Sequence, residues 1–155
     1  MVSIIVPIYN AQSYLKECLQ SIKNQTFKDF EVICINDGSS DSSLKICEEF
    51  TKQDNRFKVY SQENKGVSIA RNNGIKYSKG EFIVFIDSDD VIDKNYLMTL
   101  IELSNQSIDL CIGYYCRALA SLGTINGNRD TTVLNPQTYI DSLLKKKIQF
   151  STICC

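Results

Sequence analysis

Apolar runs and amphipathic segments alternate along roughly the first hundred residues of the chain. Short apolar runs of the kind that form buried parallel strands occupy residues 2–6, 30–35, 57–60 and 81–86. The segments between them carry apolar side chains at helical spacing, with Leu15, Leu19 and Ile22 on the face of the first. Strands that alternate with helices of this length predict βαβ crossovers, a mostly parallel sheet and therefore an α/β fold.

Polar residues mark the expected starts of two helices, and the periodic pattern weakens later in the chain. Asn10 and Asp41 are placed to cap the helices that follow them. Further along, the pattern predicts a helix over residues 66–77, a helix over 95–103, a strand over 108–115, a loop over 123–130 and a helix over 136–144. No terminating element is evident before residue 155, so we expect the front portion of a larger domain.

Composition and charge narrow the class of protein. The chain has 155 residues, of which 43% are hydrophobic and 23% charged, with a net charge of −1. A nearly neutral chain argues against a general nucleic-acid or membrane-surface binder. The run Lys145 to Lys147 is interpreted as a solvated helix end, with membrane or acceptor contact as the alternative. We expect neither a signal peptide at the start nor a membrane span.

Cysteine and histidine usage limits the chemistry further. The seven Cys show no repeated CxxC spacing, and Cys18, Cys34, Cys47 and Cys111 lie in apolar segments. They are therefore interpreted as small buried thiols in a reducing compartment. The chain contains no His, so any general base within it must be Asp or Glu.

Polar clusters follow the carboxyl ends of the four predicted strands. They comprise residues 7–10, 37–39, 64–66 with Arg71, and 87–90. Ligands bind at this edge in open parallel sheets, because the loops that follow the strands meet there. The sequence therefore predicts one crevice that gathers residues distant in the chain.

The run Asp87-Ser88-Asp89-Asp90 is the strongest single candidate for metal chemistry. Three carboxylates in four residues repel one another unless a cation or hydrogen-bond donors neutralise them. A hard divalent ion accepts carboxylate and phosphate oxygens together, and could hold a diphosphate as a leaving group. The alternative is a solvated turn that caps the next helix, but the position directly after an apolar strand favours the metal site.

Three other side chains suit a nucleotide, each with a structural alternative. A carboxylate at Asp37 can accept the N3–H of uracil, which cytosine lacks, and the alternative is ordinary turn chemistry. Tyr9 offers a ring for base stacking, or is a partly buried core aromatic. Arg71 has a guanidinium suited to phosphate oxygens, or pairs with an acid at the surface.

Taken together, these motifs resemble the family 2 glycosyltransferases of the GT-A fold. The resemblance covers about the first hundred residues and rests on VSIIVPIYN at 2–10, NDGSSD at 36–41, NKG at 64–66, ARN at 70–72, GE at 80–81 and DSDD at 87–90. It implies a Rossmann-like α/β/α sandwich. It also implies transfer of a sugar, with inversion, from a nucleoside diphospho-sugar, usually a UDP-sugar, to a saccharide or lipid-linked acceptor.

The resemblance also implies roles for individual residues. Pro7 and Tyr9 match residues that line the base pocket, and Asn10 is counted with them. Asp37 matches the residue that reads the uracil edge, and Arg71 a basic residue near the base and phosphates.

The acidic run matches the DxD motif of the family. Asp87 is expected to face ribose or metal, and Asp89 to bind Mn²⁺ or Mg²⁺ beside the diphosphate. Asp90 and Gly66 are expected to support these contacts from behind. Residues 1–104 would form the nucleotide-sugar-binding part of one GT-A domain over residues 1–155, and residues 105–155 would begin its acceptor part. The enzyme would be cytoplasmic, with possible peripheral association with the inner face of the membrane.

One departure from the family pattern leaves the catalytic residue unknown. The base of the family is usually an acid well downstream, often in a Glu-Asp pair, and no such pair follows Asp90. We therefore expect the base to lie outside this chain, and a non-catalytic nucleotide-sugar-binding module is the alternative function. A dehydrogenase is disfavoured because GxGxxG is absent after the first strand. The sugar, the acceptor and the oligomeric state are not predicted.

Overall fold

The computed structural model describes residues 1–104 and contains the predicted alternation of strands and helices. Its elements are β1 (Val2–Ile8), α1 (Leu15–Lys23), β2 (Phe30–Asp37), α2 (Ser43–Gln53), β3 (Phe57–Gln62), α3 (Val67–Tyr77), β4 (Phe82–Phe85) and α4 (Tyr96–Ser104). The chain divides into one unit of residues 1–97 and a second of residues 98–155. All four strands lie in the first unit.

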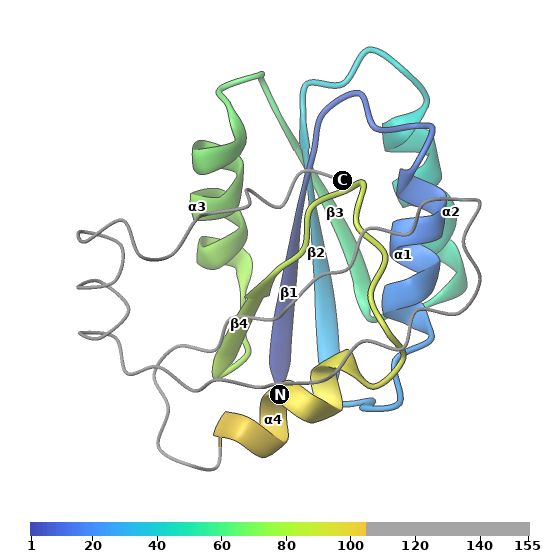
Figure 1. Cartoon of the computed structure of the whole chain (residues 1–155). Helices are drawn as coiled ribbons and strands as arrows, with labels where there is room; N and C mark the ends of the chain where they lie inside the picture. The colour runs from blue at the N-terminus through green and yellow to red at the C-terminus, as the bar shows by residue number, and fades with distance from the viewer. Residues whose placement is uncertain (105–155) are drawn as a thin grey trace, which may run out of the picture. The chain divides into compact units, whose positions relative to one another are not determined.

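The four strands form one parallel sheet in the order β3-β2-β1-β4. Helices α1 and α2 cover one face of the sheet and α3 covers the other (Figure 1). The chain thus steps from β1 to β2 and β3 along one face, then returns over the other face to place β4 beside β1. This is the predicted α/β/α sandwich, and the strand order reverses at β1, where ligands bind in such sheets.

The two central strands form the core of the sheet. Every residue of β1 and β2 is buried, as expected of strands covered on both faces. Pro7 occupies a position of β1 that opposes Ile35 of β2. The β1–β4 ladder ends at the pair of Ile5 and Phe85, so the missing N–H of Pro7 falls beyond that ladder.

Helices α1, α2 and α3 each bury one face, although the predicted faces of α2 and α3 also included Leu44, which is half-buried, and Val67, which is exposed. Helix α1 buries Leu15, Cys18, Leu19 and Ile22, and α2 buries Cys47 and Phe50. Helix α3 presents Ala70 and Gly74 to the sheet. A side chain at Gly74 would meet Ile5 Cγ2, so the glycine allows α3 to lie directly on β1.

Several local predictions need correction. Strands β1, β2 and β3 continue to Ile8, Asp37 and Gln62, beyond the predicted ends at residues 6, 35 and 60. Strand β4 is shorter than the predicted run over 81–86 and is mostly exposed, not buried. Asn10 does not cap α1, which begins at Leu15, because Asn10 adopts φ 50° and bonds to the loop after β2 instead. Asp41 accepts the N–H of Ser43 at 2.9 Å, but the residue at the cap position of α2 is Ser42.

Several other predictions fall outside residues 1–104. They concern the strand over 108–115, the loop over 123–130, the helix over 136–144, the lysines 145–147, and Cys111. Cys18, Cys34 and Cys47 are buried and free, as predicted. Within the part that the structure describes, no helix has the length and apolar character needed to cross a membrane.

Candidate functional site

The loops after β1 and β2 are joined directly at the carboxyl edge of the sheet. Asn10 Oδ1 accepts the backbone N–H of Ser40 at 2.9 Å, and the N–H of Asn10 donates to Ser39 Oγ at 3.1 Å. The left-handed conformation of Asn10 turns its backbone toward this loop, and Asn tolerates that conformation better than most residues. The Asn side chain therefore fixes the loop that carries Tyr9 to the loop that follows Asp37.

A second set of contacts joins the same two segments a few residues further along each of them. The N–H of Ala11 donates to Ser43 Oγ at 2.9 Å, and the N–H of Gln12 donates to Asp41 Oδ2 at 3.0 Å. Desolvation would raise the pKa of Asp41, but the hydrogen bonds from Ser43 and Gln12 lower it below its ordinary value. Asp41 thus holds the loops as a carboxylate.

Asp37 joins β2 to the loop between β3 and α3. The residue is only 3% exposed, and its carboxylate receives three hydrogen bonds. Oδ1 accepts from Gln62 Nε2 at 2.7 Å and from the N–H of Lys65 at 2.9 Å, and Oδ2 accepts from the N–H of Gly66 at 2.9 Å. Since a carboxylate oxygen accepts about two hydrogen bonds, Oδ2 keeps capacity for one more donor.

Two glycines make this arrangement possible. Gly66 has φ 88°, and a Cβ at this position would have no atom of the described residues within 4 Å, so the backbone before α3 stays open. Gly38 has φ 72°, and a Cβ there would meet the backbone nitrogen of Asn64 at 2.9 Å. The backbone conformation of both loops, and the close approach at Gly38, therefore favour residues without a Cβ.

Arg71 of α3 pairs with Asp87, the first residue of the acidic run. Its Nη2 donates to Asp87 Oδ1 at 2.6 Å, and the two side chains are 35% and 32% exposed. Arg71 Nε is buried and has no acceptor among the described residues. A buried N–H without an acceptor favours an anionic ligand beside it, because the unsatisfied donor costs free energy.

The remaining acids lie on a turn next to α1. Asp89 is exposed, and the N–H of Asp90 donates to the carbonyl of Asp87 at 3.0 Å. That carbonyl also accepts from Cys18 Sγ at 3.4 Å. Burial, together with the charges of Asp90, Asp89 and Asp87, raises the pKa of the Cys18 thiol to about 12.

The described residues alone supply few ligands for a metal. Among residues 1–104, no three Asp, Glu or Cys side chains are arranged around a common ion position. Asp87 and Asp89 offer hard carboxylate oxygens, the type that Mn²⁺ and Mg²⁺ prefer. An ion held by two carboxylates would take its other ligands from phosphate oxygens or water.

Tyr9 and Pro7, the two residues expected to line the pocket for the nucleobase, differ in exposure. The side chain of Tyr9 is 55% exposed, so its ring is accessible, and it is not part of the core. Pro7 is buried within β1.

Two polar residues of this region were not predicted from the sequence. Gln62 contacts Asp37, and Asn73 Nδ2 donates to Gln62 Oε1 at 2.6 Å. Gln62 is the last residue of β3, and the predicted strand stopped at residue 60. Extending that strand by two residues would have placed Gln62 at the carboxyl edge with the other candidates.

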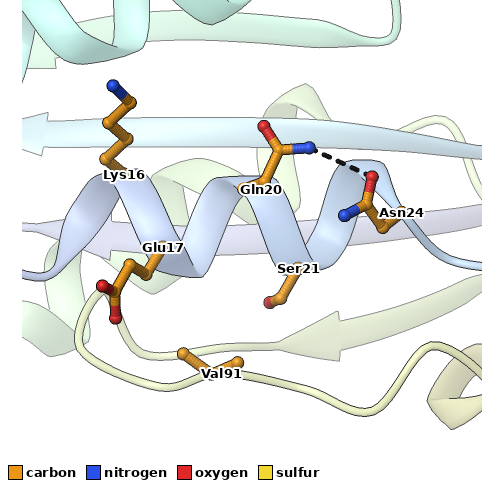
Figure 2. A pocket seen from close by; sticks show the side chains of 6 residues that line it. All are labelled: Lys16, Glu17, Gln20, Ser21, Asn24 and Val91. Atoms are coloured by element: carbon orange, nitrogen blue, oxygen red, sulfur yellow. Dashed lines mark hydrogen bonds between the residues drawn. The ribbon is translucent and has the colours of Figure 1, made fainter.

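A separate groove of about 550 Å³ lies beside α1 (Figure 2). It is lined by five polar residues and one apolar residue: Lys16, Glu17, Gln20, Ser21, Asn24 and Val91. In Figure 2 the Gln20 amide donates to Asn24 Oδ1 at 3.0 Å along the helix. The groove contains none of the predicted site residues.

Known proteins resemble this chain along most of its length. Glycosyltransferase GlyG of Streptococcus pneumoniae is 44% identical over 74% of this chain and 39% of its own. A poly(ribitol-phosphate) beta-glucosyltransferase of Bacillus spizizenii is 36% identical over 97% of this chain and 24% of its own. The chain thus spans less than half the length of these relatives.

A solved structure shows the same fold. TarS of S. aureus, residues 1–349 in complex with UDP-GlcNAc, is 33% identical and superposes with a TM-score of 0.60 over 68% of this chain and 31% of its own. The sequence model described as "Glycosyl transferase family 2" matches residues 3–154. With its parallel sheet and its loops at the carboxyl edge, the chain belongs to glycosyl transferase family 2 and has the GT-A fold.

Proposed function

We propose that residues 1–104 bind a nucleoside diphospho-sugar, with a UDP-sugar as the donor, for a metal-dependent glycosyltransferase. One observation carries the proposal: three direct contacts tie the loops at a single sheet edge. They are Asn10 with Ser40, Asp37 with Gly66, and Arg71 with Asp87. These contacts gather an acceptor for a base, a guanidinium and the acidic run.

The uracil base of the donor would bind at Asp37. Oδ2 accepts one hydrogen bond and has the capacity for one more, and uracil offers an N3–H where cytosine has none. The exposed ring of Tyr9 would stack on the base, with Pro7 and Asn10 shaping the wall next to it. TarS, solved with UDP-GlcNAc, supports a uridine nucleotide.

The diphosphate would lie between Arg71 and the acidic run. The buried Nε of Arg71 supplies a donor for a phosphate oxygen. Asp89, with Asp87, would hold Mn²⁺ or Mg²⁺, which when bound neutralises charge on the departing diphosphate. Asp90 and Gly66 support this arrangement, since Asp90 bonds to the Asp87 carbonyl and Gly66 to Asp37.

The transfer itself extends beyond the described residues. We propose direct displacement with inversion, onto a saccharide or lipid-linked acceptor, with residues 105–155 beginning the acceptor part of the same domain. The acid that serves as base is expected outside this chain. We place the enzyme in the cytoplasm, with peripheral membrane association where the acceptor is lipid-linked.

Calorimetry with UDP, CDP and GDP, each with and without Mn²⁺, tests the donor site on this chain. We expect UDP to bind more tightly than CDP or GDP, and to bind more tightly with Mn²⁺ than without. Absence of UDP binding in the presence of Mn²⁺ would refute the proposal. Donor hydrolysis and transfer by a longer native chain would then separate an enzyme from a binding module.

A further inference from the structure

A directed chain of hydrogen bonds runs from the surface of α3 to the buried Asp37 carboxylate. Lys76 Nζ donates to Asn73 Oδ1 at 3.2 Å, and Asn73 Nδ2 donates to Gln62 Oε1 at 2.6 Å. Gln62 Nε2 then donates to Asp37 Oδ1 at 2.7 Å. The four side chains therefore connect α3 and β3 to Asp37 of β2, the residue proposed to bind the nucleobase.

The chemistry of its two ends fixes the direction of this chain. An ammonium group only donates hydrogen bonds, and a carboxylate only accepts them. The amides of Asn73 and Gln62 lie between these ends, so each must turn its oxygen toward Lys76 and its nitrogen toward Asp37. A reversed Gln62 amide would set its oxygen against the carboxylate and leave a half-buried group unsatisfied.

The chain decides which carboxylate oxygen is available. Gln62 Nε2 and the N–H of Lys65 together occupy Oδ1, whereas Oδ2 receives only the N–H of Gly66. Without the Gln62 donor, only the N–H groups of Lys65 and Gly66 would hold the carboxylate, and it could rotate away from them. Gln62 thus helps to fix the carboxylate so that Oδ2 is the oxygen with capacity for one more donor.

We infer that Gln62 and Asn73 are positioning residues that set the base selectivity of the site through Asp37. The inference rests on the proposed function, in which Asp37 Oδ2 accepts the uracil N3–H. Neither residue contacts the nucleotide; Gln62 orients the carboxylate, and Asn73 orients Gln62. Selectivity for uracil over cytosine depends on this orientation, because only a correctly aimed acceptor distinguishes a base with N3–H from one without.

Two substitutions test the inference by different routes. Gln62→Met keeps the length of the side chain and removes the donor. Asn73→Asp leaves Gln62 in place but replaces the amide that donates to Gln62 Oε1 by a carboxylate. The Gln62 amide then cannot direct its nitrogen to Asp37 without setting its oxygen against the new carboxylate. Pairing of that carboxylate with Lys76 helps to preserve α3. Asn55→Asp, at an exposed position in the turn before β3, is the control for the added charge.

The main measurement is the ratio of UDP to CDP affinity by calorimetry with Mn²⁺. We expect the ratio to fall about tenfold in Gln62→Met and in Asn73→Asp, because a hydrogen bond to a charged group is lost, and to stay unchanged in Asn55→Asp. A merely structural role would weaken both nucleotides alike. Equal weakening, or an unchanged ratio in both variants, would overturn the inference.

A second measurement does not depend on nucleotide binding. Amide hydrogen exchange at Lys65 and Gly66 reports whether Asp37 still holds their N–H groups. We expect both amides to lose protection in the two variants and to keep it in Asn55→Asp. If the unsubstituted chain binds neither UDP nor CDP, the proposed function fails, and unchanged protection in the variants overturns the positioning role separately.

Discussion

Arg71 Nη2 lies 2.6 Å from Asp87 Oδ1, so the guanidinium occupies an oxygen that the proposed metal would also seek. The pair joins α3 to the turn after β4, and its side chains are about one-third exposed, at 35% and 32%. At such exposure the pair contributes little to folding. In the proposed site, Arg71 would keep Asp87 in place and would compete with a cation for it.

This competition predicts opposite effects of Arg71→Gln on two ligands. Without nucleotide, Mn²⁺ should bind more tightly, because Asp87 loses its guanidinium partner. UDP with Mn²⁺ should bind about ten- to a hundredfold more weakly, because the donor to phosphate is gone. Calorimetry with each ligand measures both effects. Arg56→Gln, which removes the same charge from a pair with Asp54, should change neither affinity, and a uniform loss of both affinities in Arg71→Gln would contradict the competition.

Asp89 is expected to bind the metal but to contribute little to the stability of the fold. Its side chain is exposed, so Asp89→Asn should change the free energy of unfolding by no more than about 0.5 kcal/mol. The same substitution should remove the increase in UDP affinity that Mn²⁺ gives. Titrations of UDP with and without Mn²⁺ check this, and Glu81→Gln at the other end of β4 is the charge-matched control. A Mn²⁺ effect that survives in Asp89→Asn would remove this residue from the metal site.

The order of strands and helices could be predicted because it depends on local apolar periodicity. The ends of β2 and β3 could not, since their last residues, Asp37 and Gln62, are polar and extend the strands through pairing with neighbours. Asn10 shows the same limit: its partner Ser40 lies 30 residues away, and a capping rule considers only local neighbours.

The topology of the sheet was enough to predict that the candidate residues meet at one edge. It was not enough to predict which residues they pair with. Parallel strands bring the loops after them to one edge, so the sequence could place Asp37, Arg71 and Asp87 there. Which acid pairs with Arg71, and which donors hold Asp37, depends on side-chain geometry across β3, α3 and β4. Asn73 was missed for this reason, because an Asn inside a helix is ordinary until its partner is known.

Close packing of α3 on β1 gives a prediction for stability. Gly74→Ala should destabilise the fold by about 1–2 kcal/mol, because the added methyl meets Ile5 Cγ2 and the strain exceeds the gain in helix propensity. Urea denaturation measures the change. In an Ile5→Ala background the same substitution should cost clearly less, since Cγ1 and Cγ2 are removed and only the Cβ of residue 5 remains in tight contact, at 3.3 Å. Equal costs in both backgrounds would show that Ile5 is not the obstacle.

Glu31 anchors a polar network at the opposite edge of the sheet and should make stability depend on acidity. It is 5% exposed; Oε1 accepts from Ser3 Oγ at 2.8 Å and from the N–H of Lys79 at 2.7 Å, and Oε2 accepts from Lys58 Nζ at 2.7 Å. Burial acts to raise the pKa of Glu31, but the hydrogen bonds from Lys58, Ser3 and Lys79 lower it below its ordinary value of 4.5.

The sign of the effect follows from that lowered pKa. Below about pH 4.5 the unfolded chain takes up a proton at Glu31 before the folded chain does, so stability falls as pH falls through the folded pKa. Glu31→Gln should cost about 2 kcal/mol at neutral pH and flatten the acid limb of a plot of unfolding free energy against pH. Asp29→Asn, at a side chain 68% exposed, should leave that limb almost unchanged. If stability falls as steeply with pH in Glu31→Gln as in the parent chain, Glu31 is not the cause of the acid sensitivity. The cause would then be Asp41 and Asp54, whose pKa values are also lowered.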